Sequence, residues 1–215
     1  MAHRAKPVDR SKSGRSAQIT SSWSVYRLKI KLRGTDPPVW RRIAVLGEST
    51  LELLHRVIQI VMGWDDYHVY GFMTKDEWIM PRTSSGIDSM WVGMTVPYPT
   101  AYANSRRLKS VARQAKTKFR YIYDLGDKWE HEIRVEAISA RQDTDRVPVC
   151  LDGQMACPPE DCGGPFGYGK LKQTLSDPAS SEHDSMREWA GADFDPVVFD
   201  IDAVNRRLSD EFKID

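Results

Sequence analysis

The feature that most constrains the fold is a hairpin pattern on both sides of the short polar segment 124–127. Before and after this segment, large apolar or aromatic residues occupy every second position. Such alternation is typical of strands that bury one face. Two strands joined by so short a connection pair antiparallel, so the pattern predicts an antiparallel sheet. The alternating residues are Phe119, Tyr121 and Tyr123 on the first strand, and Trp129, His131, Ile133, Val135 and Ala137 on the second.

The remaining elements follow from the same reasoning. Alternation predicts strands over 26–32 and 39–46, and a hairpin formed by 67–74 and 77–80. Ser49 and Glu52 have the spacing of a capping box and open a helix that extends to about Met62, where Gly63 ends it. Three short helices are expected near 167–176, 183–190 and 199–208. The sequence therefore predicts an α+β fold, with a largely antiparallel sheet, one long helix after the second strand and a short-helical C-terminal segment.

The domain organisation follows from length and composition. The chain has 215 residues, of which 40% are hydrophobic, and this is enough for one substantial core. Residues 1–21 are basic and poor in large apolar residues, so we expect a disordered tail. Residues 22–215 are expected to form a single domain with an irregular excursion over 82–116 and a cysteine loop over 148–166.

The balanced charge of the whole chain hides a strongly basic segment. Lys and Arg number 31 and Asp and Glu number 30, yet residues 104–120 contain seven basic residues and no acidic one. Clustered cations neutralise phosphates, and the nearby aromatics Tyr102, Phe119 and Tyr121 could stack on exposed bases. A solvated loop beside a strand is the alternative interpretation. The candidate nucleic-acid-binding residues are Arg106, Arg107, Lys109, Arg113, Lys116 and Lys118.

All three cysteines lie within thirteen residues, in a segment rich in Gly and Pro. Cys150, Cys157 and Cys162 could supply three ligands of a tetrahedral structural zinc site, which needs four. His131 is the first choice for the fourth ligand, and His68 is the second. The alternatives are buried thiols without a metal, or a redox pair, although the spacing is not that of a C-x-x-C site.

A second candidate site is a group of carboxylates and histidines. Asp124 and Asp127 flank the turn of the central hairpin, whereas Asp65, Asp66 and His68 follow the long helix. If the two hairpins share a sheet, these groups could converge, bind a cation and activate water. The plainer alternative is that the aspartates bond local backbone and that His131 faces the core.

The sequence points to a protein of a reducing cytoplasm without a membrane segment. The apolar run 57–62 is far too short to cross a bilayer, and the basic N-terminus lacks the apolar stretch of a signal peptide. An odd number of clustered cysteines also argues against a secreted disulfide framework.

Several sequence motifs resemble a known family. They are YRLKIKL at 26–32, PVWRRI at 38–43, GWDDYH at 63–68, YDLGDKWEHEI at 123–133, CPPEDCGG at 157–164 and FDPVVFD at 194–200. Over residues 24–80 and 117–208 the chain is similar to the plasmid open-reading-frame-three family. That family is named from a root-inducing (pRi) plasmid and is also described as a TnpR-type passenger protein of transposons and insertion elements. The resemblance implies a compact α+β fold and an association with mobile elements, but no established activity.

Three functions are compatible with these observations. The first is an accessory or binding module with a structural metal site, which contacts nucleic acid or a mobile-element protein through the basic segment. The second is a metal-dependent hydrolase or nuclease that uses the histidine and carboxylate groups. The third is a protein–protein adaptor with exposed Trp and Tyr residues. We do not expect recombinase activity, because the serines Ser11, Ser13 and Ser16 of the N-terminal region lie in the predicted tail.

Overall fold

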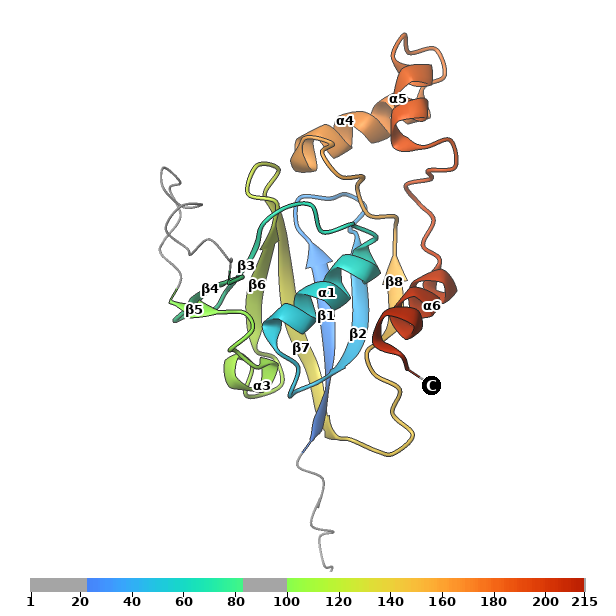
Figure 1. Cartoon of the computed structure of the whole chain (residues 1–215). Helices are drawn as coiled ribbons and strands as arrows, with labels where there is room; N and C mark the ends of the chain where they lie inside the picture. The colour runs from blue at the N-terminus through green and yellow to red at the C-terminus, as the bar shows by residue number, and fades with distance from the viewer. Residues whose placement is uncertain (1–22, 83–99, 215) are drawn as a thin grey trace, which may run out of the picture.

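The structure is a computed structural model that describes residues 23–82 and 100–214. In this part of the chain eight strands form one sheet (Figure 1). The strands are β1 (Ser24–Leu32), β2 (Trp40–Leu46), β3 (Tyr70–Met73), β4 (Trp78–Met80), β5 (Ala101–Tyr102), β6 (Lys118–Tyr123), β7 (Trp129–Ala140) and β8 (Val149–Gln154).

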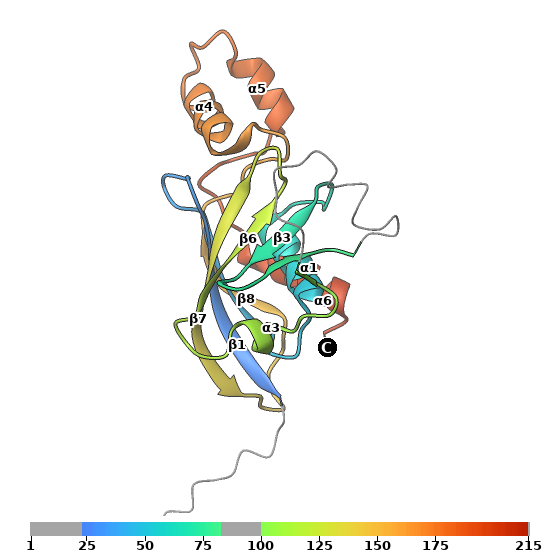
Figure 2. The ribbon, with the colours of Figure 1, turned by 90° about the vertical axis from the view of Figure 1, so that its left-hand side faces the viewer.

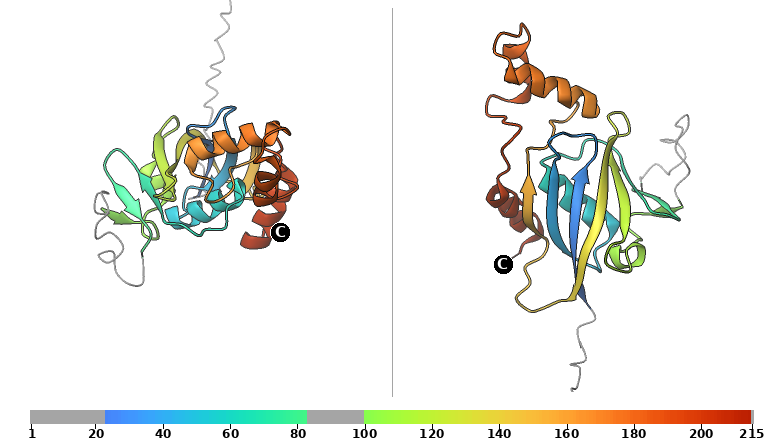
Figure 3. Two further views of the ribbon diagram at one scale, coloured as in Figure 1. Left: turned by 90° about the horizontal axis from the view of Figure 1, so that it is seen from above. Right: turned by 180° about the vertical axis from the view of Figure 1, so that it is seen from behind.

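The sheet has the order β5-β4-β3-β6-β7-β1-β2-β8. Every neighbouring pair is antiparallel except β4 and β5, which run parallel. The long helix α1 (Leu51–Met62) crosses one face, and the opposite face is free of helices in the described residues (Figure 3). The predicted α+β fold with a largely antiparallel sheet is therefore confirmed.

The central hairpin forms as its alternation predicts. Tyr121 pairs with His131 and Tyr123 pairs with Trp129, and all four side chains are fully buried beneath α1. Glu130 and Glu132 point to the opposite face, where Glu130 pairs with Arg33 and Arg120. The period of two in the sequence thus sorts the core side chains from the exposed ones.

Helix α1 begins one residue later than a cap at Ser49 would place it. The N-cap is Thr50, whose Oγ1 accepts a hydrogen bond from the backbone N–H of Leu53 at 3.1 Å. The capping box predicted for Ser49 and Glu52 is therefore wrong in its cap residue. Gly63 ends the helix as expected, in the left-handed region at φ 91°.

The identity of the cap leads to a stability prediction. Thr50→Ala should lower the free energy of unfolding by about 1 kcal/mol, because the N–H of Leu53 loses its acceptor. Ser49→Ala, one residue earlier, should cost less, because no hydrogen bond of the Ser49 side chain is found within the described residues. Urea denaturation of both variants measures the difference, and equal losses would contradict the assignment of the cap.

Part of the predicted irregular excursion is ordered. Residues 83–99 lie outside the described residues, but strand β5 and the short helix α3 (Leu108–Val111) follow them. Backbone hydrogen bonds attach this segment to the start of α1: Leu51 N donates to Arg106 O, and Leu108 N donates to Ser49 O. The basic segment is thereby fixed against the helix instead of forming a free loop.

The C-terminal part adds the three helices expected, α4 (Gly164–Ser176), α5 (His183–Ala190) and α6 (Ile201–Phe212). Helices α4 and α5 lie beyond one end of the sheet, whereas α6 lies beside β8 and α1 (Figures 1 and 2). The predicted cysteine loop over 148–166 differs at both ends, because the buried Cys150 belongs to strand β8 and helix α4 already begins at Gly164.

Candidate functional site

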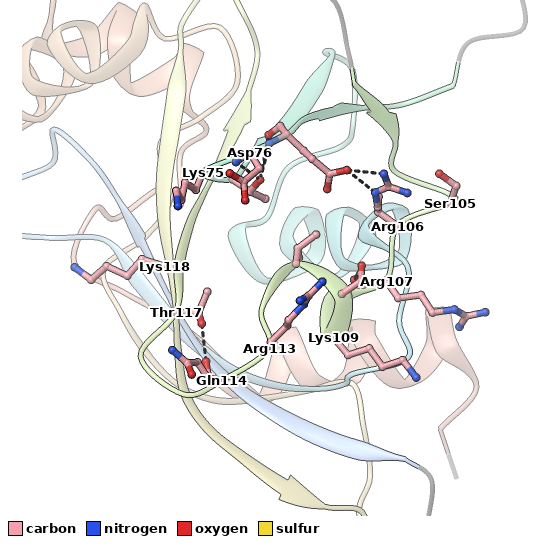
Figure 4. Close-up of a pocket in the computed structure, with 14 residues that line it drawn as sticks. Lys75, Asp76, Ser105, Arg106, Arg107, Lys109, Arg113, Gln114, Thr117 and Lys118 are labelled. Carbon is pink, nitrogen blue, oxygen red and sulfur yellow. Dashed lines mark hydrogen bonds and ion pairs between the residues drawn. The ribbon is translucent and has the colours of Figure 1, made fainter.

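The basic segment lines an open groove at the lower end of β6. Its walls are the β3–β4 turn, the segment around α3 and the first residues of β6 (Figure 4). The groove has a volume of about 840 Å³, and six basic but only two acidic side chains line it. The basic ones are Lys75, Arg106, Arg107, Lys109, Arg113 and Lys118.

Four of these cations already have carboxylate partners. Arg106 contacts Glu77 through Nε at 2.9 Å and Nη2 at 2.5 Å. Lys109 Nζ lies 2.5 Å from Glu48 Oε1, and Arg107 Nη1 lies 3.7 Å from Glu48 Oε2 and also donates to the backbone oxygen of Glu48. On the other wall, Lys118 pairs with Glu132 at 3.0 Å. These contacts therefore partly neutralise the predicted basic surface.

Two cations in the groove have no such partner. Across the described parts of the chain, no hydrogen bond or ion pair engages the side chain of Lys75 or Arg113. Lys75 comes from the β3–β4 turn, and Arg113 comes from the residues after α3 (Figure 4). Sequence reasoning did not select Lys75, because it is separated from the basic segment along the chain.

Two features of the predicted nucleic-acid surface are different in the structure. Lys116 lies outside the groove and instead lines a hollow of about 520 Å³ on the helix-free face, with Arg27, Arg42, Arg134 and Glu136. Phe119 and Tyr121, which we expected to stack on bases, are buried in the core. The stacking expectation is therefore wrong for both residues, because they occupy the inward positions of β6.

The three cysteines are free thiols, of which Cys150 is buried and Cys157 and Cys162 are partly buried. Burial raises the pKa of all three thiols, and for Cys162 it raises the pKa to about 12. The buried guanidinium of Arg41 favours the thiolates of Cys150 and Cys157, but its effect is smaller than that of burial. Thiols in this state are protonated at neutral pH and are poor nucleophiles.

His131 is fully buried, and neither of its ring nitrogens has a hydrogen-bond partner within the described residues. Burial lowers its pKa to about 4, so the ring is neutral at physiological pH. It packs edge-on against Trp64, with ring centroids 5.4 Å apart. His131 and the cysteines do not belong to the one described group of ligand atoms that lie within 4.8 Å of one another, so zinc binding by them stays a prediction.

That group is formed by His68, Asp124 and Asp161. His68 and Asp124 were both singled out in the sequence, and the structure brings them together. Asp161 and its neighbour Glu160 were missed, because the cysteines on either side of them drew the metal hypothesis. His68 Nε2 lies 3.1 Å from Asp161 Oδ1 and 3.8 Å from both Asp124 Oδ2 and Glu160 Oε2.

The other predicted aspartates have separate roles. Asp66 Oδ1 lies within hydrogen-bond distance, 2.8 Å, of Nε2 on the buried ring of His55. Asp127 Oδ2 accepts a hydrogen bond from the backbone N–H of Gly163. Asp65 is exposed, and its backbone N–H donates to Glu160 Oε1 at 3.1 Å. Asp65 and Asp127 thus hold the loop of Glu160 and Gly163 against the sheet.

Within the described residues, no helix is both long enough and apolar enough to cross a membrane.

Comparisons with known proteins place the chain in one group. Residues 24–203 match the family model of the plasmid pRiA4b ORF-3-like protein. The "Uncharacterized protein y4hQ" of Sinorhizobium fredii is 34% identical over 194 residues, which cover 87% of this chain and 92% of that protein. A crystal structure of a protein of unknown function, MM3350 from Methanosarcina mazei, superposes with a TM-score of 0.72 at 31% identity and covers 84% of this chain and 97% of that one. The match to the family model spans most of the sequence, as the sequence motifs led us to expect, and the chain belongs to the plasmid pRiA4b ORF-3-like family.

Proposed function

We propose that this protein is an accessory nucleic-acid-binding protein that contacts phosphates through the groove between the β3–β4 turn, α3 and β6. The observation that carries the proposal is that Lys75 and Arg113, on different walls of one basic groove, have no hydrogen-bond or ion-pair partner among residues 23–82 and 100–214. A cation without a carboxylate partner keeps its full capacity to neutralise a phosphate and release a counterion.

The paired cations of the groove support the same function. Arg106, Arg107 and Lys109 remain between about one third and one half exposed in their ion pairs. Exposed pairs of this kind contribute roughly 0–1 kcal/mol, so they can exchange a carboxylate for a phosphate at little cost. Glu48 and Glu77 then hold the side chains in place in the free protein.

The chemistry of the groove favours contacts to the nucleic-acid backbone over contacts to bases. Phe119 and Tyr121 are buried, and the described residues that line the groove include no aromatic side chain. Phosphate contacts set affinity without reading sequence, whereas stacking needs an exposed ring. The groove therefore suits double-stranded nucleic acid, whose bases are already stacked.

Charge reversal at the two unpaired cations tests this function. The double variant Lys75→Glu, Arg113→Glu should bind a fluorescent 20-base-pair duplex about tenfold more weakly at low salt, and the slope of log K against log salt should fall by about 2. These substitutions remove no hydrogen bond or ion pair within the described residues. Reversal of Arg106 or Lys109 would be a poorer test, because it would also repel Glu77 or Glu48.

The control variant carries Arg206→Glu and Arg207→Glu, two exposed residues of α6 with the same change in net charge. It should retain most of the affinity if the groove is the contact surface. Equal losses in both double variants would mean that net charge alone governs binding, and salt-insensitive binding would exclude phosphate contacts altogether.

A protein-binding role is the second candidate, and exposed apolar side chains favour it. Phe166 is 89% exposed on α4 and Trp189 is 49% exposed on α5, while Val197 and Val198 are exposed before α6. None of these four residues lines the groove. A protein that bound no nucleic acid at low salt, but associated with another protein through α4 and α5, would support the second function.

A further inference from the structure

Three loops that are distant in the sequence bring one imidazole and three carboxylates together at the upper end of the sheet. His68 precedes β3, Asp124 follows β6, and Glu160 and Asp161 precede α4. The carboxylate oxygens lie 3.1–3.8 Å from His68 Nε2. This cluster lies at the opposite end of β6 from the basic groove, because Lys118 begins the strand and Tyr123 ends it.

The buried hydroxyl of Tyr123 fixes two members of the cluster. It donates to Glu160 Oε1 at 2.9 Å and accepts the backbone N–H groups of Tyr67 at 3.0 Å and His68 at 3.3 Å. Burial, followed by the contact with Glu160, raises the pKa of this phenol, so the donor stays protonated. Glu160 Oε1 also accepts the N–H of Asp65, which leaves only Oε2 free to face His68.

Asp124 is held in a similar way. Its Oδ1 accepts the backbone N–H of Gly126 at 2.7 Å, and its Oδ2 faces His68 at 3.8 Å. The side chain of Asp161 is 68% exposed and closes the cluster on the solvent side. Asp124 and Glu160 thus each use one oxygen for the fold and direct the other toward the same nitrogen.

Two atoms of this cluster lack the partners that buried polar groups normally have. His68 Nε2 and Glu160 Oε2 are both inaccessible to solvent, and neither makes a hydrogen bond within the described residues. Native proteins leave few such groups unpaired, because an unsatisfied buried polar atom costs stability. Their common position points to a ligand between them.

The charge balance points to the sign of that ligand. In the described parts of the chain, the ion pairs of Asp124, Glu160 and Asp161 involve His68 and no Lys or Arg. Three carboxylates around one imidazole repel each other strongly where burial reduces screening. A divalent cation would offset this repulsion and would bond to the nitrogen and the oxygen that make no hydrogen bond within the described residues.

We propose that His68, Asp124, Glu160 and Asp161 bind a divalent first-row transition cation through His68 Nε2 and one oxygen of each carboxylate that reaches it. One imidazole with several carboxylates suits Mn²⁺, Fe²⁺ or Zn²⁺, whereas an all-thiolate set would select softer ions. The cation joins the α1–β3, β6–β7 and β8–α4 connections and so stabilises the folded state. Of the ligands predicted for zinc, this site uses only His68, the second choice for the fourth ligand, and none of Cys150, Cys157 and Cys162.

Titration of the chelator-treated full-length chain with Mn²⁺ tests the proposal. Calorimetry and electron paramagnetic resonance should find one Mn²⁺ per chain, and a hundredfold excess over Kd should raise Tm by roughly 5–10 °C. Asp161→Asn should weaken the affinity at least tenfold, as should His68→Gln. Asp161 is exposed and Asn has the same shape, so this variant should keep the circular dichroism spectrum of the parent.

Two control variants make the result specific. His183→Gln alters a histidine of α5 that pairs with the adjacent Asp184 and does not belong to the cluster. This variant should bind Mn²⁺ as the parent does. Cys157→Ser should also retain Mn²⁺, because the proposed donor set includes no sulfur. The absence of saturable Mn²⁺ binding in the parent chain would overturn the proposal, as would binding that neither Asp161→Asn nor His68→Gln weakens.

Discussion

Arg41→Ala should lower the free energy of unfolding by about 4 kcal/mol. The guanidinium is 1% exposed, and within the described residues it has backbone carbonyls as partners instead of a carboxylate. Nε donates to Val61 O at 2.8 Å, while Nη1 donates to Trp40 O at 2.8 Å and to Gln154 O at 2.9 Å. The group also lies 3.8 Å from the centroid of the Phe199 ring.

The effect should be large because one side chain connects several elements. Val61 belongs to the last turn of α1, so Arg41 satisfies a helix carbonyl that has no partner inside the helix. Gln154 ends β8, and Phe199 lies just before α6. Truncation leaves these carbonyls buried without donors and opens a cavity between the helix, the sheet and the C-terminal segment.

Arg42→Ala is the matched comparison, because the next residue points to the opposite face of β2. Its partners Glu136 and Asp152 are partly exposed, so its loss should cost only about 1 kcal/mol. Urea unfolding of both variants at one pH measures the difference. A cost for Arg41→Ala no larger than that for Arg42→Ala would contradict the role of Arg41 as a connection in the core.

Gly167→Ala should cost roughly 3 kcal/mol of stability. A Cβ atom at this position would lie 1.9 Å from the backbone oxygen of Cys162, and a backbone carbonyl cannot move aside as the end of a side chain can. The substitution would displace the loop that carries Glu160 and Asp161. We therefore also expect weaker Mn²⁺ binding in this variant.

Gly169→Ala provides the control within the same helix. Nothing lies within 4 Å of a Cβ atom at Gly169, and alanine favours the helix by about 0.5–1 kcal/mol over glycine. The two substitutions should thus change the free energy of unfolding in opposite directions. Thermal and urea denaturation test this, and a stabilised Gly167→Ala variant would show that the loop does not pack as described.

Much of the fold could be predicted from the sequence, because apolar and polar residues alternate clearly along its strands. The inward position of His131 and the outward positions of Glu130 and Glu132 follow from the period of two. The sequence alone places the N-cap of α1 at Ser49 and not at Thr50, because two neighbouring hydroxyl residues both suit a cap. The hydrogen bond from the backbone N–H of Leu53 to Thr50 Oγ1 distinguishes them.

The candidate sites were less predictable, because they depend on contacts between distant segments. The sequence showed the cations of 104–120, but it could not show that Glu48 and Glu77 pair with three of them or that Lys75 joins their groove. The sequence likewise indicated Cys157 and Cys162 as metal ligands, but not Glu160 and Asp161 between them. The acids between them meet His68 only through the packing of the β8–α4 connection against the sheet.

The most direct test of the proposed function is amide hydrogen exchange of the full-length chain with and without a saturating 20-base-pair duplex at low salt. Phosphate binding in the groove predicts slower exchange in the peptides that contain residues 74–77 and 105–118, with unchanged exchange over α4 and α5. Slower exchange confined to other segments, with 74–77 and 105–118 unaffected, would contradict the proposal that the groove is the nucleic-acid contact surface.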